Sequence, residues 1–220
     1  MRNRSTGSRQ RLGIVVLAAA AATGCLQKAT THTLYLSPDG RLSWLAIEKD
    51  VRSDDTDPVR RFAEEQDYLG ATAGGVHGVG RGLAALDPTR LRTRAIRDER
   101  PFIVATEAEF SSLEFAVQRL LVQLRVPGDV RVTGDGASTT LRVRIDAFAA
   151  NAGDDGPESD AVELVEDLDR YRIVLTAGRF TSATGFTLTD GATVALPVTT
   201  PWETIVANRG VLELSLTWTR

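Results

Sequence analysis

The sequence predicts an α+β domain: a largely antiparallel sheet built from hairpins, with two or three helices packed on one of its faces. Short segments in which apolar and polar residues alternate are joined by turn sequences, and this pattern is typical of antiparallel strands. A few other segments carry apolar residues at helical spacing instead. A regular order of strand, helix and strand is not present, so a parallel α/β sheet is not expected.

The first hairpin is expected at residues 31–51. THTLYL (31–36) and RLSWLAIEKDV (41–51) both alternate between apolar and polar residues. SPDG (37–40) separates them and supplies the Pro and Gly that tight turns favour. These segments therefore predict two antiparallel strands joined by a turn.

A helix is expected to follow, because Asp57 is a good N-cap residue and Pro58 suits the first helical position. It should end near Gly70. Phe62, Gln66 and Leu69 fall on one face of this helix, with Val59 and Ala63 beside them. The glycine-rich segment after it is interpreted as a flexible connector, followed by a short helix at residues 79–86.

The second half of the chain continues the pattern. Residues 91–96 and 102–110 predict a second hairpin, and SSLEFAVQRLLVQL (111–124) predicts the clearest helix, with capping-box spacing between Ser111 and Glu114. A third hairpin is centred on residues 134–136. The expected remaining elements are an acidic loop (151–160), a short helix (161–168), strands within 171–180, 185–190, 192–197 and 211–218, and a connector (197–210).

The first 24 residues read as a secretory signal peptide. The first eleven carry four arginines and no acidic residue, and an apolar run from Leu12 to Ala22 follows. A membrane-spanning helix needs about 20 apolar residues, so this run is too short to be one. A basic start, a short apolar core and small residues at its end are the features of a leader that is removed on export.

The segment Ala22-Thr23-Gly24-Cys25 resembles the bacterial lipobox, although its first residue departs from the preferred Leu. In that motif the peptidase cuts before the cysteine, and diacylglycerol is attached to the sulfur, which implies acyl chains such as palmitate. Cys25 is then the mature N-terminus and the lipid-attachment residue, with residues 25–30 as a tether and residues 31–220 as one domain. An ordinary secretory signal that happens to contain a cysteine is the alternative.

This interpretation limits the possible partners. Cys25 is the only cysteine, so no internal disulfide is expected. The leader holds four of the 26 basic residues and none of the 29 acidic ones, so the mature chain has a formal charge of −7. Nucleic acid is therefore not expected as a partner. The predicted location is the bacterial cell envelope, with the lipid on Cys25 as the membrane contact; Leu26 after the cysteine favours the outer membrane if the organism has two.

Residues 177–218 (AGRFTSATGFTLTDG to LELSLTW) resemble uncharacterised bacterial lipoproteins, including the mycobacterial LppM-type group. The resemblance extends to the leader and to residues 31–51, and it consists of strands and turns without a catalytic motif. It implies an envelope protein of unknown biochemical role, with a binding domain as one possibility.

Few residues are candidates for catalysis or for binding a metal or cofactor. The chain has two histidines, His32 and His77, and lacks the G-x-S-x-G motif of serine hydrolases. GGVHGVGRG, around His77, matches neither a phosphate loop nor a dinucleotide fingerprint. A solvated loop histidine is the default interpretation of His77. No metal or cofactor is expected, because the acidic clusters at 54–57 and 154–160 lack the calcium-loop pattern and read as solvated loops.

The three tryptophans, Trp44, Trp202 and Trp218, are either core residues or a ligand platform. Trp44 and Trp218 occupy strand positions, so the core is favoured for them, whereas Trp202 follows Pro201 in the connector and is a candidate for exposure.

The function favoured by the sequence is a non-catalytic binding or structural domain for a lipid, glycolipid or protein. The alternative is an envelope hydrolase that uses His77 with nearby carboxylates.

Overall fold

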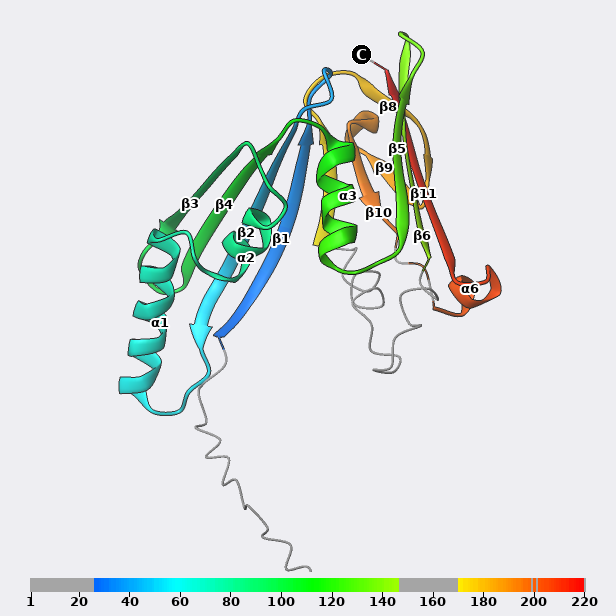
Figure 1. Cartoon of the computed structure of the whole chain (residues 1–220). Helices are drawn as coiled ribbons and strands as arrows, with labels where there is room; N and C mark the ends of the chain where they lie inside the picture. The colour runs from blue at the N-terminus through cyan, green and yellow to red at the C-terminus, as the bar shows by residue number, and fades with distance from the viewer. Residues whose placement is uncertain (1–25, 147–169, 199, 201, 220) are drawn as a thin grey trace, which may run out of the picture.

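The computed structural model describes residues 26–146, 170–198, 200 and 202–219 (Figure 1). Within these ranges the chain forms two sheets and several helices. The strands of the larger sheet are β1 (Leu26–Leu36), β2 (Leu42–Ser53), β3 (Arg90–Arg97), β4 (Phe102–Phe110), β7 (Tyr171–Leu175), β9 (Phe186–Thr189) and β10 (Val194–Pro197). Those of the smaller sheet are β5 (Gly128–Gly134), β6 (Ser138–Asp146), β8 (Arg179–Thr184) and β11 (Val211–Thr219). The helices are α1 (Pro58–Ala73), α2 (Gly78–Ala84), α3 (Leu113–Gln123), α6 (Trp202–Ala207) and the 3₁₀ turn η2 (Asp190–Ala192).

The α+β class with mostly antiparallel strands is confirmed. The strand order is β3-β4-β2-β1-β7-β10-β9 in the larger sheet and β5-β6-β11-β8 in the smaller one. Among the strand pairs of the described residues, β1 and β7 run parallel and the others antiparallel. The strands are divided between two sheets. Residues 171–180 do not form one strand: β7 joins the larger sheet beside β1, and β8 joins the smaller one beside β11.

The tether assigned to residues 25–30 is also shorter than expected. β1 begins at Leu26, which is paired with Ser53, and the pairing continues along the strand to Thr30 opposite Glu48. Residues 26–30 show little alternation of apolar and polar side chains, so the sequence pattern did not mark them. They form a strand because the end of β2 offers its backbone N–H and C=O groups for pairing. Cys25, directly before, lies outside the described residues.

Helices α1, α2 and α3 lie on one face of the larger sheet, as expected, whereas α6 contacts β11 of the smaller sheet (Figure 1). β2 presents Leu42, Trp44 and Ala46 to this face, where the core also includes Leu83 before the end of α2 and Leu113 at the start of α3. Trp44 and Trp218 are both 2 % exposed, which confirms them as core residues. α3 lies between the two sheets and contacts β4 of one and β5 of the other. The main core is therefore enclosed by two sheets and α3.

Gly185 is the point at which the chain passes from the smaller sheet to the larger one. β8 ends at Thr184 and β9 begins at Phe186. Gly185 has φ +74°, and a Cβ built there would lie 2.3 Å from Leu214 Cδ2. Glycine meets both requirements of this corner, since it tolerates positive φ and leaves room for Leu214.

The glycine-rich segment around His77 is more ordered than expected. The predicted flexible connector contains the start of α2, and both His77 and Gly80 are buried. Residues 197–210, expected as a plain connector, contain α6. The predicted acidic loop and short helix at 151–168 lie outside the described residues. The expected helix at 111–124 and the three hairpins are confirmed.

Candidate functional site

An apolar cavity lies where the two sheets and α3 meet. Its volume is about 90 Å³. Every side chain that lines it is aliphatic or aromatic: Leu34, Trp44, Tyr171 and Ile173 from the larger sheet, Leu141, Val143, Ile145 and Leu214 from the smaller one, Leu113, Val117, Leu120 and Leu121 from α3, and Phe186 and Pro197 from β9 and β10. Among the described residues, the lining contains no carboxylate, thiol, imidazole or aliphatic hydroxyl, so these residues offer shape and apolar surface but no reactive group.

His32 contacts two of the aromatic lining residues, Trp44 and Tyr171. Trp44 Nε1–H donates to His32 Nδ1 at 3.1 Å. The His32 ring stacks on Tyr171, with ring centroids 4.6 Å apart and 12° between the planes. His32, which lies on β1 as expected, therefore orients two walls of the cavity. A water molecule inside would find few hydrogen-bond partners, and apolar cavities of this kind stay dry.

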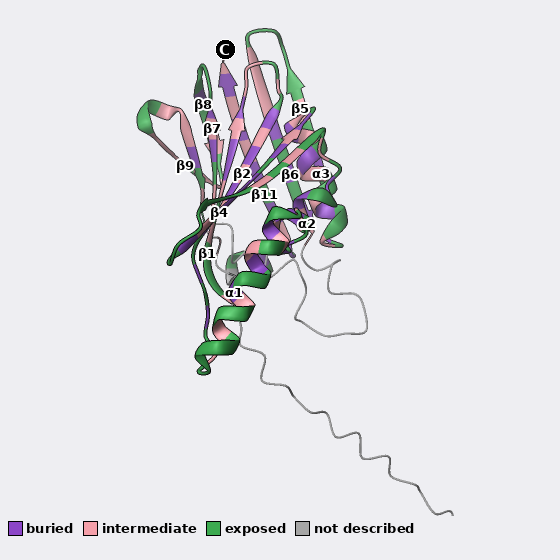
Figure 2. Cartoon of the chain, turned by 90° about the vertical axis from the view of Figure 1, so that its left-hand side faces the viewer, coloured by how far each residue is buried: buried purple, intermediate pink, exposed green. Residues whose placement is uncertain are grey.

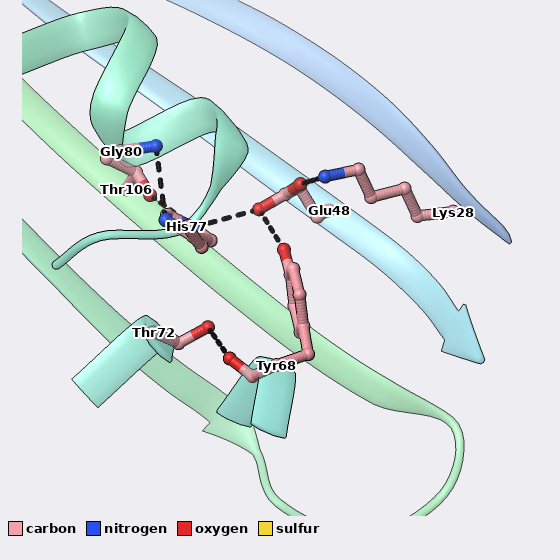
Figure 3. A network of polar contacts seen from close by, with 7 residues as sticks. All are labelled: Lys28, Glu48, Tyr68, Thr72, His77, Gly80 and Thr106. Atoms are coloured by element: carbon pink, nitrogen blue, oxygen red, sulfur yellow. Dashed lines mark hydrogen bonds and ion pairs between the residues drawn. The ribbon is translucent and has the colours of Figure 1, made fainter. Parts of the chain in front are cut away.

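A buried polar network lies on the same face of the larger sheet, under α1 and α2 (Figure 3). Its centre is the Glu48 carboxylate on β2, which is 1 % exposed. Glu48 Oε2 accepts a hydrogen bond from Tyr68 Oη at 2.7 Å and lies 3.0 Å from His77 Nε2. Glu48 Oε1 is paired with Lys28 Nζ, from β1. Thr106 on β4 completes the network, with its Oγ1 3.3 Å from His77 Nε2.

The hydrogen bonds define the protonation of His77. Its Nδ1 accepts the backbone N–H of Gly80 at 3.1 Å, so His77 is the N-cap of α2. Since Nδ1 carries no proton, the ring proton is on Nε2 and points toward Glu48. The pKa of Glu48 is raised by burial, but hydrogen bonds from His77, Lys28 and Tyr68 outweigh burial and lower it to about 2. Burial and the hydrogen bond to Glu48 raise the pKa of Tyr68 well above its ordinary range.

The surroundings of His77 test the alternative prediction of an envelope hydrolase. His77 does meet a carboxylate within hydrogen-bond distance, as a general base would. However, its side chain is fully buried, and both ring nitrogens are occupied by partners within the protein. The expectation of a solvated loop histidine is therefore wrong, and no substrate could reach the ring in this arrangement. The network ties α1 and α2 to the sheet, which is a structural role.

Of the other predicted site residues, some lie outside the described residues and others lie in the loop before α1. Cys25 and residues 154–160 lie outside the described residues, and so does the side chain of Trp202. Asp54, Asp55 and Asp57 lie in the loop before α1, where Asp57 caps the helix by accepting Val59 N–H at 2.9 Å. Within the described part of the chain, no group of three or more His, Cys, Asp or Glu residues is placed to hold a metal ion.

Glu48 is not among the residues predicted from the sequence, although its position in β2 carries a signal. β2 places Leu42, Trp44, Ala46 and Glu48 on the same side, so a carboxylate follows three core residues in the period-two pattern. A charged residue at such a position needs buried partners. Those partners could not be identified from the sequence, because Lys28, Tyr68 and His77 lie 20 to 29 positions away.

Comparisons with known proteins add little. No family model matches the chain, and no curated protein matches it in sequence. A match among solved structures is the NMR structure of the folded domain of Mycobacterium tuberculosis LppM, with 11 % identity over 90 % of this chain and 91 % of that one. The TM-score is 0.38, too low to support an argument about fold or function. Across the described residues, no helix is both long and apolar enough to cross a membrane.

Proposed function

We propose that this protein is a lipid-anchored protein of the bacterial envelope whose domain binds an apolar ligand between its two sheets and catalyses no reaction. The observation that carries the proposal is the cavity of about 90 Å³, to which the described residues contribute only aliphatic and aromatic side chains. A dry void lacks contacts on one side of every lining atom, so it lowers stability unless something fills it. A ligand with an acyl chain or a similar apolar group would supply those contacts.

The size of the cavity limits what enters it. An engineered apolar cavity of about 150 Å³ binds benzene, and this one is smaller. It accommodates the end of an acyl chain, while pockets for whole small-molecule ligands are about 300–1,000 Å³. A longer chain would require α3 to move away from the sheets. Val117 and Leu120, which line the cavity from α3, are only partly buried, so the cavity lies close to the surface of the molecule.

The ligand proposal is tested with cis-parinaric acid, a fluorescent fatty acid, added to the full chain. Val117→Trp should fill the cavity and abolish the fluorescence increase on binding. Val122→Trp is the matched control, since Val122 lies on the same helix and is 61 % exposed; this variant should bind like the parent. Equal binding by both variants, or no binding by the parent, would overturn the proposed ligand site.

The anchor is tested separately. The leader and Cys25 support lipidation, so metabolic labelling with palmitate should mark the parent chain and leave Cys25→Ala unmarked. The variant should also leave the membrane fraction or remain unprocessed. If Cys25→Ala is cleaved and still sediments with membranes, Cys25 is not the anchor.

A further inference from the structure

Helix α1 has an apolar stripe turned away from the protein. An amphipathic helix normally packs its apolar stripe on the core. In α1, however, the buried residues are Glu65, Tyr68 and Thr72, whereas Val59 is 75 % exposed and Phe62 is 59 % exposed. Figure 2 shows the outer side of α1 as a largely exposed surface. The residues of this outer stripe are all uncharged: Val59, Phe62, Ala63, Gln66, Gly70 and Ala73.

The side of α1 that faces the sheet accounts for this orientation, because Tyr68 belongs to a small apolar cluster with Val51 and Phe102 and also takes part in buried hydrogen bonds. Tyr68 donates to Glu48 in the buried network. Glu65, 1 % exposed, accepts the backbone N–H of Ser53 at 3.3 Å and pairs with Arg100 Nη2 at 2.6 Å. These bonds satisfy buried polar groups that would be costly to leave unpaired. They hold the helix in one orientation, and the uncharged stripe is left outside.

The exposed apolar residues lie at the end of the molecule where the described chain begins. Leu26 is paired with Ser53, and Ser53 contacts α1 through Glu65. Arg100, in the turn between β3 and β4, reaches the same glutamate. Ile96, 54 % exposed, lies near the end of β3, four residues before Arg100. The first turns of α1, the start of β1 and the β3–β4 turn are therefore neighbours (Figure 1).

We propose that α1 lies against the lipid bilayer, with Val59 and Phe62 inserted at the boundary between headgroups and acyl chains. This inference rests on the proposed lipid anchor, because Cys25 directly precedes Leu26. β1 begins at Leu26, so no flexible linker separates the anchor from the domain. The anchor then holds α1 at the bilayer surface at a high effective concentration. Helices of this kind bury their apolar face about 5–10 Å into the interface.

The features of the stripe favour a bilayer over a protein partner. A stable protein interface buries about 800 Å² on each side, whereas Val59 and Phe62 are the only large apolar side chains of the stripe. The mature chain has a charge of −7, so attraction to anionic lipids is not the driving force. Insertion of apolar side chains requires no charge. Arg60, beside the stripe, is exposed and can extend to the phosphate level.

The single cysteine makes a direct test possible. The full chain is produced in bacteria, purified in its lipidated form and placed in phosphatidylcholine vesicles. Phe62→Cys is labelled with a nitroxide, and its collisions with oxygen and with a water-soluble nickel chelate are measured by electron paramagnetic resonance. Val122→Cys on α3, at a similarly exposed position, is the control. The ratio of oxygen to nickel accessibility should be severalfold higher at position 62 than at position 122.

The outcomes separate this inference from the proposals on which it rests. The parent chain should take up no label, because the Cys25 sulfur is occupied by lipid; labelling of the parent would overturn both the anchor and the inference. An unlabelled parent with a water-exposed nitroxide at position 62 would overturn the inference alone. Dipolar broadening between labels at position 62 would show that a second copy of the chain covers α1, and this would also overturn it.

Discussion

Glu48 is the residue whose charge joins the elements at one end of the larger sheet. Its carboxylate is hydrogen-bonded to Tyr68 on α1, lies 3.0 Å from His77 Nε2 at the start of α2, and is paired with Lys28 on β1. Removing one partner from a buried charged group leaves the other partners without compensation, and this typically costs about 3–5 kcal/mol. The network therefore gives stability only while Glu48 is ionised and all of its partners are present.

The pH dependence of stability follows from the lowered pKa of Glu48. Its pKa is about 2 in the folded protein, compared with about 4.3 for an unperturbed glutamate. The contribution is fully present above pH 4.3 and is lost as the pH falls toward 2, because the unfolded chain takes up the proton first. At about 1.4 kcal/mol per pKa unit, the loss is about 3 kcal/mol. Denaturant unfolding between pH 6 and pH 2 measures it.

A comparison of variants isolates the contribution of Glu48 to the pH dependence of stability. Glu48→Gln should be less stable than the parent at neutral pH and should lack the acid-dependent loss just described. Glu107→Gln, at an exposed position on β4, should follow the parent. The pKa values of Asp39 and Asp135 are also lowered by hydrogen bonds in exposed turns, so every variant retains some acid dependence. Parallel pH profiles for the parent and Glu48→Gln would contradict the role given to Glu48.

At the scale of elements, α2 depends on a glycine that fits against its own N-cap. A Cβ at Gly80 would lie 2.6 Å from His77 Nδ1, whereas nothing lies within 4 Å of a Cβ at Gly82. Gly80→Ala should displace the His77 ring and lower the free energy of unfolding by about 2 kcal/mol through the lost hydrogen bonds. Gly82→Ala should raise it by about 0.5–1 kcal/mol, because alanine favours a helix.

Thermal unfolding of the two alanine variants beside the parent checks this prediction. The opposite signs at two positions of one short helix provide the control, since a general effect of alanine would shift both in the same direction. Stabilisation by Gly80→Ala would show that the His77 ring can move without loss.

The elements that the sequence predicted correctly are those determined by neighbouring residues. The hairpin at 31–51 follows from local alternation and from the turn at Ser37–Gly40, where Ser37 and Arg41 are hydrogen-bonded. The helix at 111–124 follows from its spacing and from the Ser112 cap, one residue after the expected Ser111. Local patterns, however, contain no information about which distant strand becomes a partner. Residues 171–180 therefore predicted one strand, although β7 and β8 belong to different sheets.

The candidate site was less predictable, for the same physical reason. The period-two pattern of β2 placed Trp44 in the core, where it lines the cavity, but Tyr171 and Phe186 join it only through long-range pairing. The orientation of α1 could not be predicted from its apolar residues, because its polar side is satisfied by Glu48 and Arg100 on other elements. Tyr68 and Leu69 also pack in a small apolar cluster there, so hydrogen bonds and apolar contacts on other elements together leave Val59 and Phe62 outside.

At the scale of the whole molecule, the end that we propose to contact the bilayer and the cavity are separate. Leu34, which lines the cavity, is eight residues along β1 from Leu26, a distance of about 27 Å at about 3.4 Å per residue. The start of β1 and the cavity are therefore different parts of the molecule.

The cavity also predicts how the two sheets respond to a loss of packing between them. Leu121, 2 % exposed, projects from α3 into the cavity lining. Leu121→Ala should lower the free energy of unfolding by about 2–5 kcal/mol, as buried leucine truncations do, and should enlarge the void. Val122→Ala, at its exposed neighbour, should have a small effect.

The enlarged void distinguishes a binding cavity from a simple packing defect. Because the lining is apolar, benzene added to Leu121→Ala should raise its unfolding temperature by occupying the void, as ligand linkage requires. The same concentration of benzene should have less effect on the parent, whose cavity is about 90 Å³. If benzene leaves Leu121→Ala unchanged, the sheets and α3 have closed over the missing side chain. The space between them would then be too easily collapsed to hold an acyl chain, and the proposed ligand site would lose its physical basis.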